Sequence, residues 1–193
     1  MRVDGTRRTR RKCGGRPDVG SGRIGVVQDC APGRATKPTV HLLCGLPGSG
    51  KTTLARQLAA DGMAVRFTLG EWMLRVHDLR YDHPDYGSAV ADCRELIWDT
   101  AKQVLATGAD VVLDWSQWSR AKRVEWAQRA QGCGAGVLLH VIDVDANIAT
   151  AQAASRRDPF SHQIDAEGVA QMVDLLEPPD PDEGIEVVIH SSR

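Results

Sequence analysis

The sequence predicts an α/β fold in which a parallel, five-stranded sheet carries helices on both faces. Short apolar runs alternate with longer segments whose apolar residues recur at helical spacing, which favours parallel strands joined by helical crossovers. The first apolar run leads into a glycine-rich turn at 45–50 and then into a helical pattern. A chain of 193 residues is long enough for one such domain with a real core.

Five segments are predicted as strands because aliphatic runs bounded by turn residues are typical of buried parallel strands. They are VHLLC at 40–44, AVRF at 64–67, VVL at 111–113, GVLLHVI at 136–142 and IEVVI at 185–189. The third strand is expected to end in Asp114. Carboxyl ends of strands are where α/β sheets place ligand residues, so Asp114 is a candidate site residue.

Helices are predicted between these strands. They cover 51–60, 71–77, 88–106, 119–131, 146–155 and 165–176. The longest has apolar residues on one face, among them Val90, Cys93 and Ile97. Ser119 and Asp165 are candidate N-caps because their side-chain oxygens can accept bonds from first-turn amides.

The charge is unevenly distributed. Residues 1–37 hold 10 of the 24 Lys and Arg residues but 3 of the 25 Asp and Glu residues. This segment has few large apolar residues, so we expect a disordered basic extension before a domain at 38–193. It is either a nucleic-acid arm or a leader without ordered structure. Its GSGRIG at 20–25 spells a dinucleotide fingerprint, but no strand pattern precedes it, so we discount that motif.

Composition restricts the class of protein. No apolar run reaches the length that spans a bilayer, and the N-terminus shows no secretory pattern. Five cysteines at irregular spacings indicate reduced thiols rather than a disulfide framework. We therefore expect a cytoplasmic protein that makes no membrane contact. The sequence does not indicate an oligomeric state.

The segment GLPGSGKTT matches the phosphate-binding pattern G-x-x-x-x-G-K-[ST], the Walker A motif, between a predicted strand and a predicted helix. Glycines let backbone amides face a common anion, and the helix N-terminus adds its dipole. The residues expected to bind ATP are Gly45, Leu46, Pro47, Gly48, Ser49, Gly50, Lys51, Thr52 and Thr53. Lys51 supplies a charge to the phosphates, and Thr52 and Asp114 are the expected Mg²⁺ ligands.

GLPGSGKTT, VVLDWSQW and AASRRD together resemble the P-loop kinases of the polynucleotide-kinase, zeta-toxin and chloramphenicol-phosphotransferase type, over residues 38–190. The resemblance implies a three-layer P-loop NTPase sandwich with a small lid. The strand before the loop is expected at the centre, beside the strand that ends in Asp114. It also implies transfer of the ATP γ-phosphoryl to a hydroxyl group.

The resemblance also implies roles for individual residues. Asp114 takes the position of the family's third-strand aspartate, and Arg123 that of a basic residue near the acceptor. Two lid arginines fall on Arg156, beside Arg157, and on Gln152, which is uncharged. The expected catalytic base falls on Gly70, with Glu71 next to it.

Because the expected position of the catalytic base is occupied by Gly70, the identity of the base stays open. Glu71 can take the role through a local shift of the backbone, Asp114 can take it, or the protein binds ATP and transfers poorly. Trp115 and Trp118 follow Asp114 and either form an aromatic wall for the acceptor or pack under the next helix. Gln117 follows Asp114 closely and is a candidate for positioning a water molecule, so a hydrolase is a further alternative.

The predicted function is an ATP- and Mg²⁺-dependent phosphotransferase, with Lys51, Asp114, Arg156 and Glu71 as catalytic residues. Arg157 is expected at the nucleotide, and Arg123 and Trp115 at the acceptor. A small-molecule or nucleotide acceptor is favoured because the domain is acidic; a nucleic-acid end stays open. The alternative is an ATP-binding switch without efficient transfer.

Overall fold

The computed structural model describes residues 37–61, 64–79, 82–157 and 164–191. The predicted basic extension, the GSGRIG motif and most of the predicted lid loop at 156–162 lie outside these residues. Within the described part of the chain, no helix is both long and apolar enough to span a membrane.

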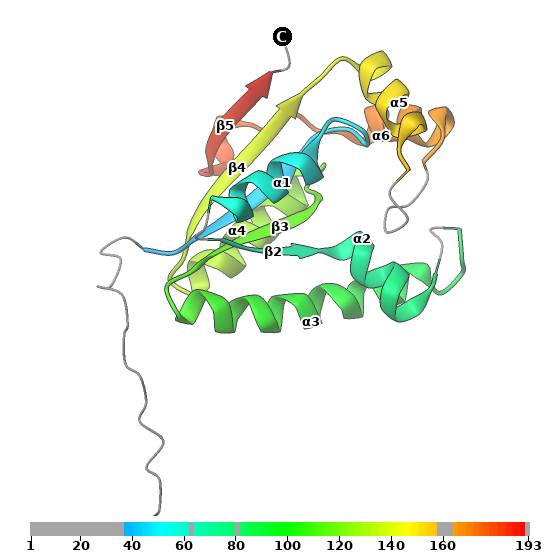
Figure 1. Ribbon diagram of the computed structural model, residues 1–193. Helices are drawn as coiled ribbons and strands as arrows, with labels where there is room; N and C mark the ends of the chain where they lie inside the picture. The colour runs from blue at the N-terminus through cyan, green and yellow to red at the C-terminus, as the bar shows by residue number, and fades with distance from the viewer. Residues whose placement is uncertain (1–36, 62–63, 80–81, 158–163, 192–193) are drawn as a thin grey trace, which may run out of the picture. The chain divides into compact units, whose positions relative to one another are not determined.

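The strands form one parallel sheet in the order β2-β3-β1-β4-β5 (Figure 1). Their bounds are Thr39–Cys44 for β1, Ala64–Thr68 for β2, Asp110–Ser116 for β3, Gly136–Asp143 for β4 and Glu186–Ser191 for β5. The predicted fold class is therefore confirmed, and the strand that leads into the glycine-rich turn is central, beside β3.

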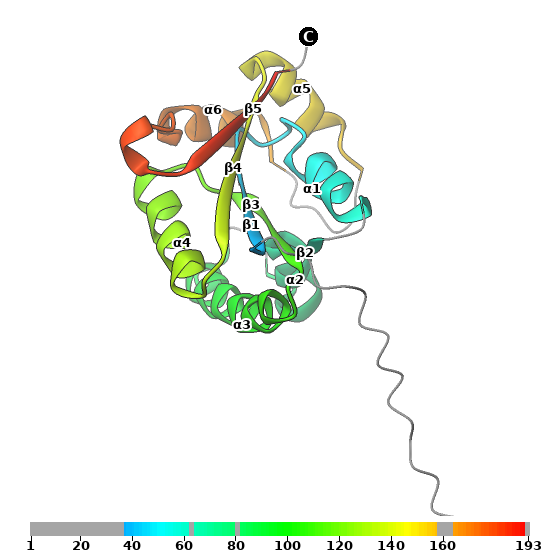
Figure 2. The same ribbon diagram turned by 90° about the vertical axis from the view of Figure 1, so that its left-hand side faces the viewer.

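Helices lie between the strands and after β4. Their bounds are Lys51–Ala60 for α1, Leu69–Trp72 for α2, Tyr86–Ala106 for α3, Arg120–Gly132 for α4, Ala146–Ser155 for α5 and Ala166–Leu175 for α6. A π-helical turn, η1, covers Met73–His77, and a 3-10 turn, η2, covers Pro181–Glu183. Helix α1 covers one face of the sheet and α3 and α4 cover the other (Figure 2).

The two faces of the sheet bury different residues because side chains alternate along a strand. Leu43 and Val112 face α1 and pack with Ala55. Val40 and Val111 belong to the larger cluster under α3 and α4. This alternation places Asp114 on the α1 side of β3 and Trp115 on the α3 side.

Two changes in predicted boundaries bear on the site, while the other boundaries move by at most two residues. The third strand does not end at Asp114 but continues to Ser116, because its pairing with β1 shifts: Leu42 lies opposite Leu113, and Leu43 opposite Ser116. Asp114 and Trp115 thus lie in a bulge, a device that redirects side chains beside functional sites. The helix predicted at 71–77 starts at Leu69 and widens into η1. Ser119 and Asp165 are confirmed as N-caps, accepting bonds from the amides of Lys122 and Gly168.

Candidate functional site

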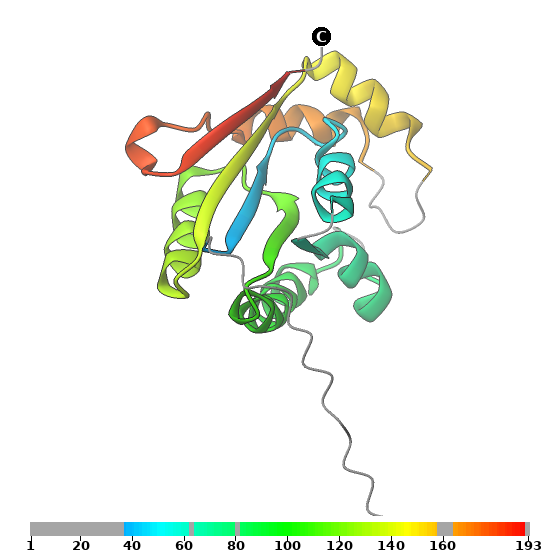
Figure 3. The same ribbon diagram turned by 60° about the vertical axis from the view of Figure 1, so that its left-hand side comes forward.

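The phosphate loop leaves the carboxyl end of β1 and enters α1, where Figure 3 shows it beside α5. Gly48 has a φ of 83°, and a Cβ there would lie 2.1 Å from the carbonyl oxygen of Ala149 in α5. A Cβ on Gly45, at φ 148°, would meet the carbonyl oxygen of Ile142 at 2.8 Å. Both positions therefore need glycine for two reasons, the backbone conformation and the close approach of a neighbouring backbone.

Lys51 folds its side chain back over the loop. Its Nζ donates to the carbonyl oxygens of Gly45 at 2.9 Å and Leu46 at 2.6 Å. Burial lowers the pKa of Lys51 to about 8, although the nearby carboxylate of Asp114 raises it. The cost of burying the ammonium thus exceeds the stabilisation that Asp114 provides. A bound polyphosphate would stabilise the ammonium further.

The carboxylate of Asp114 has three partners at the end of the sheet. Its Oδ1 accepts from the hydroxyl of Thr52 at 3.2 Å, and its Oδ2 accepts from Arg66 Nε at 2.9 Å and from Thr68 at 3.4 Å. Arg66 also donates to Glu71 Oε1 at 2.6 Å. One guanidinium therefore joins the two candidate carboxylates.

Arg66 is a site residue that sequence reasoning missed. It lies in β2, and its side chain is 16% exposed. The available signal was a charged residue inside a short apolar strand, where the alternation AVRFT places Arg66 and Thr68 on the same face. That β2 pairs with β3, the strand that carries Asp114, was not evident from the sequence, because it depends on the order of strands in the sheet.

A cavity of about 480 Å³ gathers most of the predicted site residues. Its lining includes the following predicted residues: Pro47, Gly48, Lys51, Thr52, Thr53, Glu71, Asp114, Trp115, Arg156 and Arg157. It also includes Arg56, Gly70, Tyr86, Arg94 and Trp118, which sequence analysis did not assign to the site or left undecided. The cavity lies over the carboxyl ends of β1 and β3, the position expected for an α/β site.

The hydroxyl of Thr52 and the carboxylate of Asp114 fit a magnesium ion. Both are oxygen donors and their oxygens lie 3.2 Å apart. Magnesium usually takes one or two protein ligands and completes its shell with water and substrate phosphates. Among the described residues no group of three or more His, Cys, Asp or Glu could hold a metal. A magnesium ion at this site would therefore need phosphate oxygens of a nucleotide among its ligands.

The lid is described only in part. Arg156 follows α5 directly and lines the cavity together with Arg157. The guanidinium of Arg157 donates to the carbonyl oxygens of Ala154 at 3.2 Å and of Arg156 at 3.1 Å. Gln152, at the family's other lid position, is exposed on α5.

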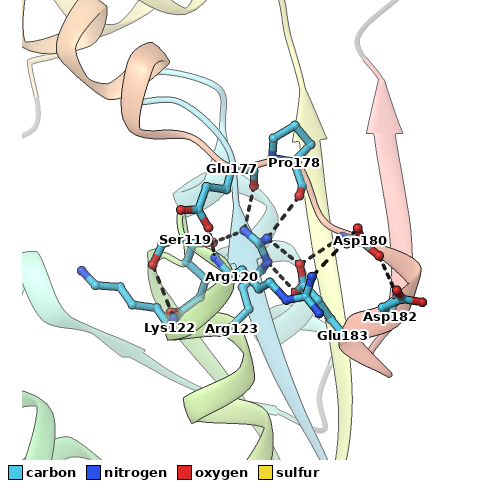
Figure 4. A network of polar contacts seen from close by, with 10 residues as sticks. Ser119, Arg120, Lys122, Arg123, Glu177, Pro178, Asp180, Asp182 and Glu183 are labelled. Carbon is cyan, nitrogen blue, oxygen red and sulfur yellow. Dashed lines mark hydrogen bonds and ion pairs between the residues drawn. The ribbon is translucent and has the colours of Figure 1, made fainter.

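Arg123 does not line the cavity, which corrects its predicted contact with the acceptor. Its side chain is fully buried and forms a bidentate ion pair with Glu183, at 2.7 and 2.6 Å (Figure 4). It also donates to backbone carbonyls of Gln117, Glu177 and Pro178. Its donors are thus used to fix the segment before β5, and none is left for a substrate.

Trp115 takes both of the places considered for it. It lines the cavity, and its ring also packs against Trp126 at a centroid distance of 5.4 Å, while Trp126 packs against Trp98 at 5.5 Å. Gln117 is fully buried and is not among the residues that line the cavity. It is therefore badly placed to position water for hydrolysis.

The chain resembles known proteins in family and in fold. The family model described as AAA domain matches residues 40–179. No curated protein matches the chain. A chain of the Pnkp1/Rnl/Hen1 RNA repair complex superposes with a TM-score of 0.62 and 19% identity, over 74% of this chain and 45% of that one.

This chain covers a larger share of two further structures. Kti12 from Chaetomium thermophilum, in complex with ADP-AlF3, gives a TM-score of 0.59 at 18% identity, over 80% of this chain and 89% of that one. A gluconokinase from Sinorhizobium meliloti 1021 gives 0.50 at 16% identity, over 82% and 84%. The chain spans less than half of the RNA repair chain, and at these identities the likeness concerns the fold. With the family match extending over well more than half of its length, the chain belongs to the AAA domain family and has the P-loop kinase fold that its sequence predicts.

Proposed function

We propose that the protein is an ATP-dependent phosphotransferase, which moves the γ-phosphoryl group of ATP to a hydroxyl of a small molecule, a nucleotide sugar or a nucleic-acid end. One observation carries the proposal. A single cavity of about 480 Å³ contains the phosphate loop, two carboxylates, the lid arginines and an aromatic wall. It thus offers a place for an acceptor hydroxyl beside the place for a triphosphate.

The phosphate loop is proposed to hold the nucleotide. The remaining amides of the loop and the N-terminus of α1 are proposed to present donors to the phosphates, because Pro47 has no N–H and the amide of Ser49 donates to the carbonyl oxygen of Leu46 at 3.1 Å. Lys51 exchanges its two carbonyl partners, Gly45 and Leu46, for phosphate oxygens. Thr52 and Asp114 would hold Mg²⁺, which supplies charge neutralisation of the β- and γ-phosphates when bound.

Transfer forms a bond between the acceptor oxygen and the γ-phosphorus, while the bond from that phosphorus to the β–γ bridging oxygen breaks. The hydroxyl proton goes to a carboxylate, and Glu71 is the proposed base because Asp114 already has three partners. Glu71 lines the cavity. Arg156 and Arg157 are proposed to neutralise the charge that develops on the phosphoryl oxygens.

A degenerate kinase or ATP-binding switch is the second candidate. The usual base position is Gly70, one lid arginine is replaced by Gln152, and Arg66 ties up one oxygen of Glu71 at 2.6 Å. That oxygen must leave Arg66 before it can approach an acceptor hydroxyl. These features predict nucleotide binding with slow transfer.

The deciding experiment follows label from γ-labelled ATP into a panel of hydroxyl acceptors, namely sugars, nucleotides and 5′-OH oligonucleotides. The proposal predicts an acceptor-dependent labelled product that Lys51→Ala abolishes. Glu71→Gln should lower the rate about 10²–10⁴-fold. The control is Lys102→Met, which removes an exposed charge on α3 outside the cavity. Tight ATP binding without labelled product from any acceptor would favour the switch, and phosphate release that needs no acceptor would favour a hydrolase.

A further inference from the structure

Part of the cavity lining comes from the helix layer opposite the phosphate loop. Tyr86 and Arg94 belong to α3, which covers the other face of the sheet from α1 (Figure 2). Trp115 faces the α3 layer in the core, and Trp118 follows β3. The cavity therefore extends from the loop on one side of the sheet to an aromatic and cationic region on the other.

Arg94 brings a guanidinium to that region from α3. Its Nε is buried without a hydrogen bond. The residue as a whole is half-buried, and among the described residues no ion pair or hydrogen bond is found for its guanidinium. The acidic group that acts on it, Glu125, is bound instead to Arg129 at 3.1 Å. Burial lowers the pKa of Arg94, but a guanidinium keeps its charge at neutral pH.

Other groups in the region add positive charge and donors. Lys122 holds its Nζ 4.1 Å from the centre of the Trp118 ring. Burial lowers the pKa of Lys122, and the nearby charge of Arg94 lowers it further. The indole nitrogen of Trp115 is also buried without a partner. Arg94 and Lys122 thus bring two cations close together, and the acidic group that acts on both, Glu125, is bound to Arg129.

We infer that Arg94 binds an oxyanion group of the acceptor, either a phosphate or a carboxylate. The rest of the acceptor molecule then lies against the rings of Trp118 and Tyr86. The planar fork of a guanidinium matches two oxygens of such a group. Aromatic faces bind sugar or base rings at small-molecule sites. The inference rests on the proposed function in calling this ligand the acceptor; the anion site itself does not depend on transfer.

The test measures thermal stability with Mg²⁺ and a non-hydrolysable ATP analogue at saturation, so that the phosphate loop is filled. Inorganic phosphate and acetate are added separately, each against chloride at the same ionic strength. We expect at least one anion to raise the Tm of the wild type by about 2–4 °C. Arg94→Met should lose this rise, and Arg94→Lys should keep part of it because it keeps the charge without the fork.

The matched control is Lys102→Met, which removes one positive charge from the same helix, where Lys102 pairs with Asp99 at the surface. It should keep the full rise. A rise with phosphate alone identifies a phosphorylated acceptor, and a rise with acetate alone identifies a hydroxy acid. An equal rise in wild type and Arg94→Met, or no rise with either anion, overturns the inference.

The failure of this inference can be told apart from that of the proposed function. If Arg94-dependent stabilisation is found but no hydroxyl compound receives label from ATP, the anion site stands and the kinase assignment falls. If label is transferred with the same kcat/KM in wild type and Arg94→Met, for charged and neutral acceptors alike, the kinase assignment stands and the anion site falls.

Discussion

Lys51 shows how one residue couples nucleotide binding to pH. Its pKa of about 8 means that the free protein loses this charge as pH rises through 8. A bound polyphosphate raises that pKa, because negative charge favours the ammonium. The complex therefore holds a proton that the free protein has lost above pH 8, and binding becomes linked to proton uptake.

We predict that the affinity for a magnesium nucleotide is constant between pH 7 and 8 and then falls by about tenfold per pH unit. Calorimetry at several pH values, in buffers of different ionisation enthalpy, measures both the affinity and the proton uptake. Lys51→Arg is the control, since arginine stays charged and its curve should remain flat. A wild-type affinity that does not change up to pH 9.5 would remove Lys51 from the phosphate site.

The residues of the site differ in how well sequence could place them. Lys51 and Thr52 were predicted because a short motif dictates both backbone and side-chain chemistry. Arg66 was missed because its importance comes from Asp114, 48 positions further along the chain. The role of Arg123 was mistaken because its partner, Glu183, is 60 positions away, and only packing shows that the pair is buried.

At the scale of elements, the contact between the phosphate loop and α5 depends on Gly48. A methyl group there would lie 2.1 Å from the Ala149 carbonyl oxygen and 2.9 Å from the Ala153 amide nitrogen, in a backbone with φ of 83°. We predict that Gly48→Ala lowers the free energy of unfolding by about 2–4 kcal/mol. It should also weaken nucleotide binding, because the loop must move away from α5.

Urea unfolding and nucleotide titration measure the two effects. Gly132→Ala, at the end of α4, is the matched control, since apart from its chain neighbours and the backbone of its own helix nothing lies within 4 Å of the added methyl group. Its stability should stay within about 1 kcal/mol of wild type. Equal unfolding free energies and equal nucleotide affinities of the two variants would show that the loop and α5 are not in tight contact at Gly48.

The connection between α4 and the segment before β5 depends on the ion pair of Arg123 and Glu183. Both side chains are buried, 0% and 2% exposed, and Arg123 holds the pKa of Glu183 below its ordinary value. Removing Arg123 leaves the buried carboxylate of Glu183 without its cationic partner. We predict that Arg123→Met costs about 3–5 kcal/mol of unfolding free energy.

Glu183→Gln should cost less, about 1–2 kcal/mol, because Arg123 keeps its three backbone acceptors. Chemical denaturation of both variants measures the difference. The folded fraction of Arg123→Met should bind an acceptor as the wild type does. An unchanged stability together with a raised KM for the acceptor would restore the role that the sequence suggested.

At the scale of the whole molecule, a row of histidines crosses the sheet on the α1 side. His41 Nδ1 lies 2.9 Å from His140 Nε2, and His140 Nδ1 lies 2.9 Å from His190 Nε2. At its other end His41 Nε2 lies 4.0 Å from Asp110. Each contact needs one proton between two nitrogens, which three neutral rings with the proton on Nε2 supply.

The row makes stability depend on pH. Burial, with His41 and His190 as neighbours, lowers the pKa of His140 to about 4 from the ordinary 6.5. Between pH 6.5 and 4 the unfolded chain therefore binds a proton that the folded protein does not. We predict that the free energy of unfolding falls by about 2–3 kcal/mol over this window as pH falls.

Denaturant unfolding at pH 7.5, 6, 5 and 4 measures this dependence. His41, whose pKa burial also lowers, contributes in the same direction, so a variant is needed to isolate His140. His140→Gln cannot titrate, and its stability should change less over the same window. A wild type and variant with parallel pH profiles would show that His140 does not carry the effect.

The sequence by itself determined the fold class, the positions of most elements and the phosphate loop, because periodicity and a local motif act over a few neighbouring residues. Only the tertiary structure decided the bulge that carries Asp114 and Trp115, the pairing of Arg66 with two carboxylates, the burial of Arg123 and the burial of the Arg94 Nε without a hydrogen bond. Each of these depends on strands or helices that are distant in the chain. The partner of a charge, and whether it has one, is set by packing rather than by local sequence.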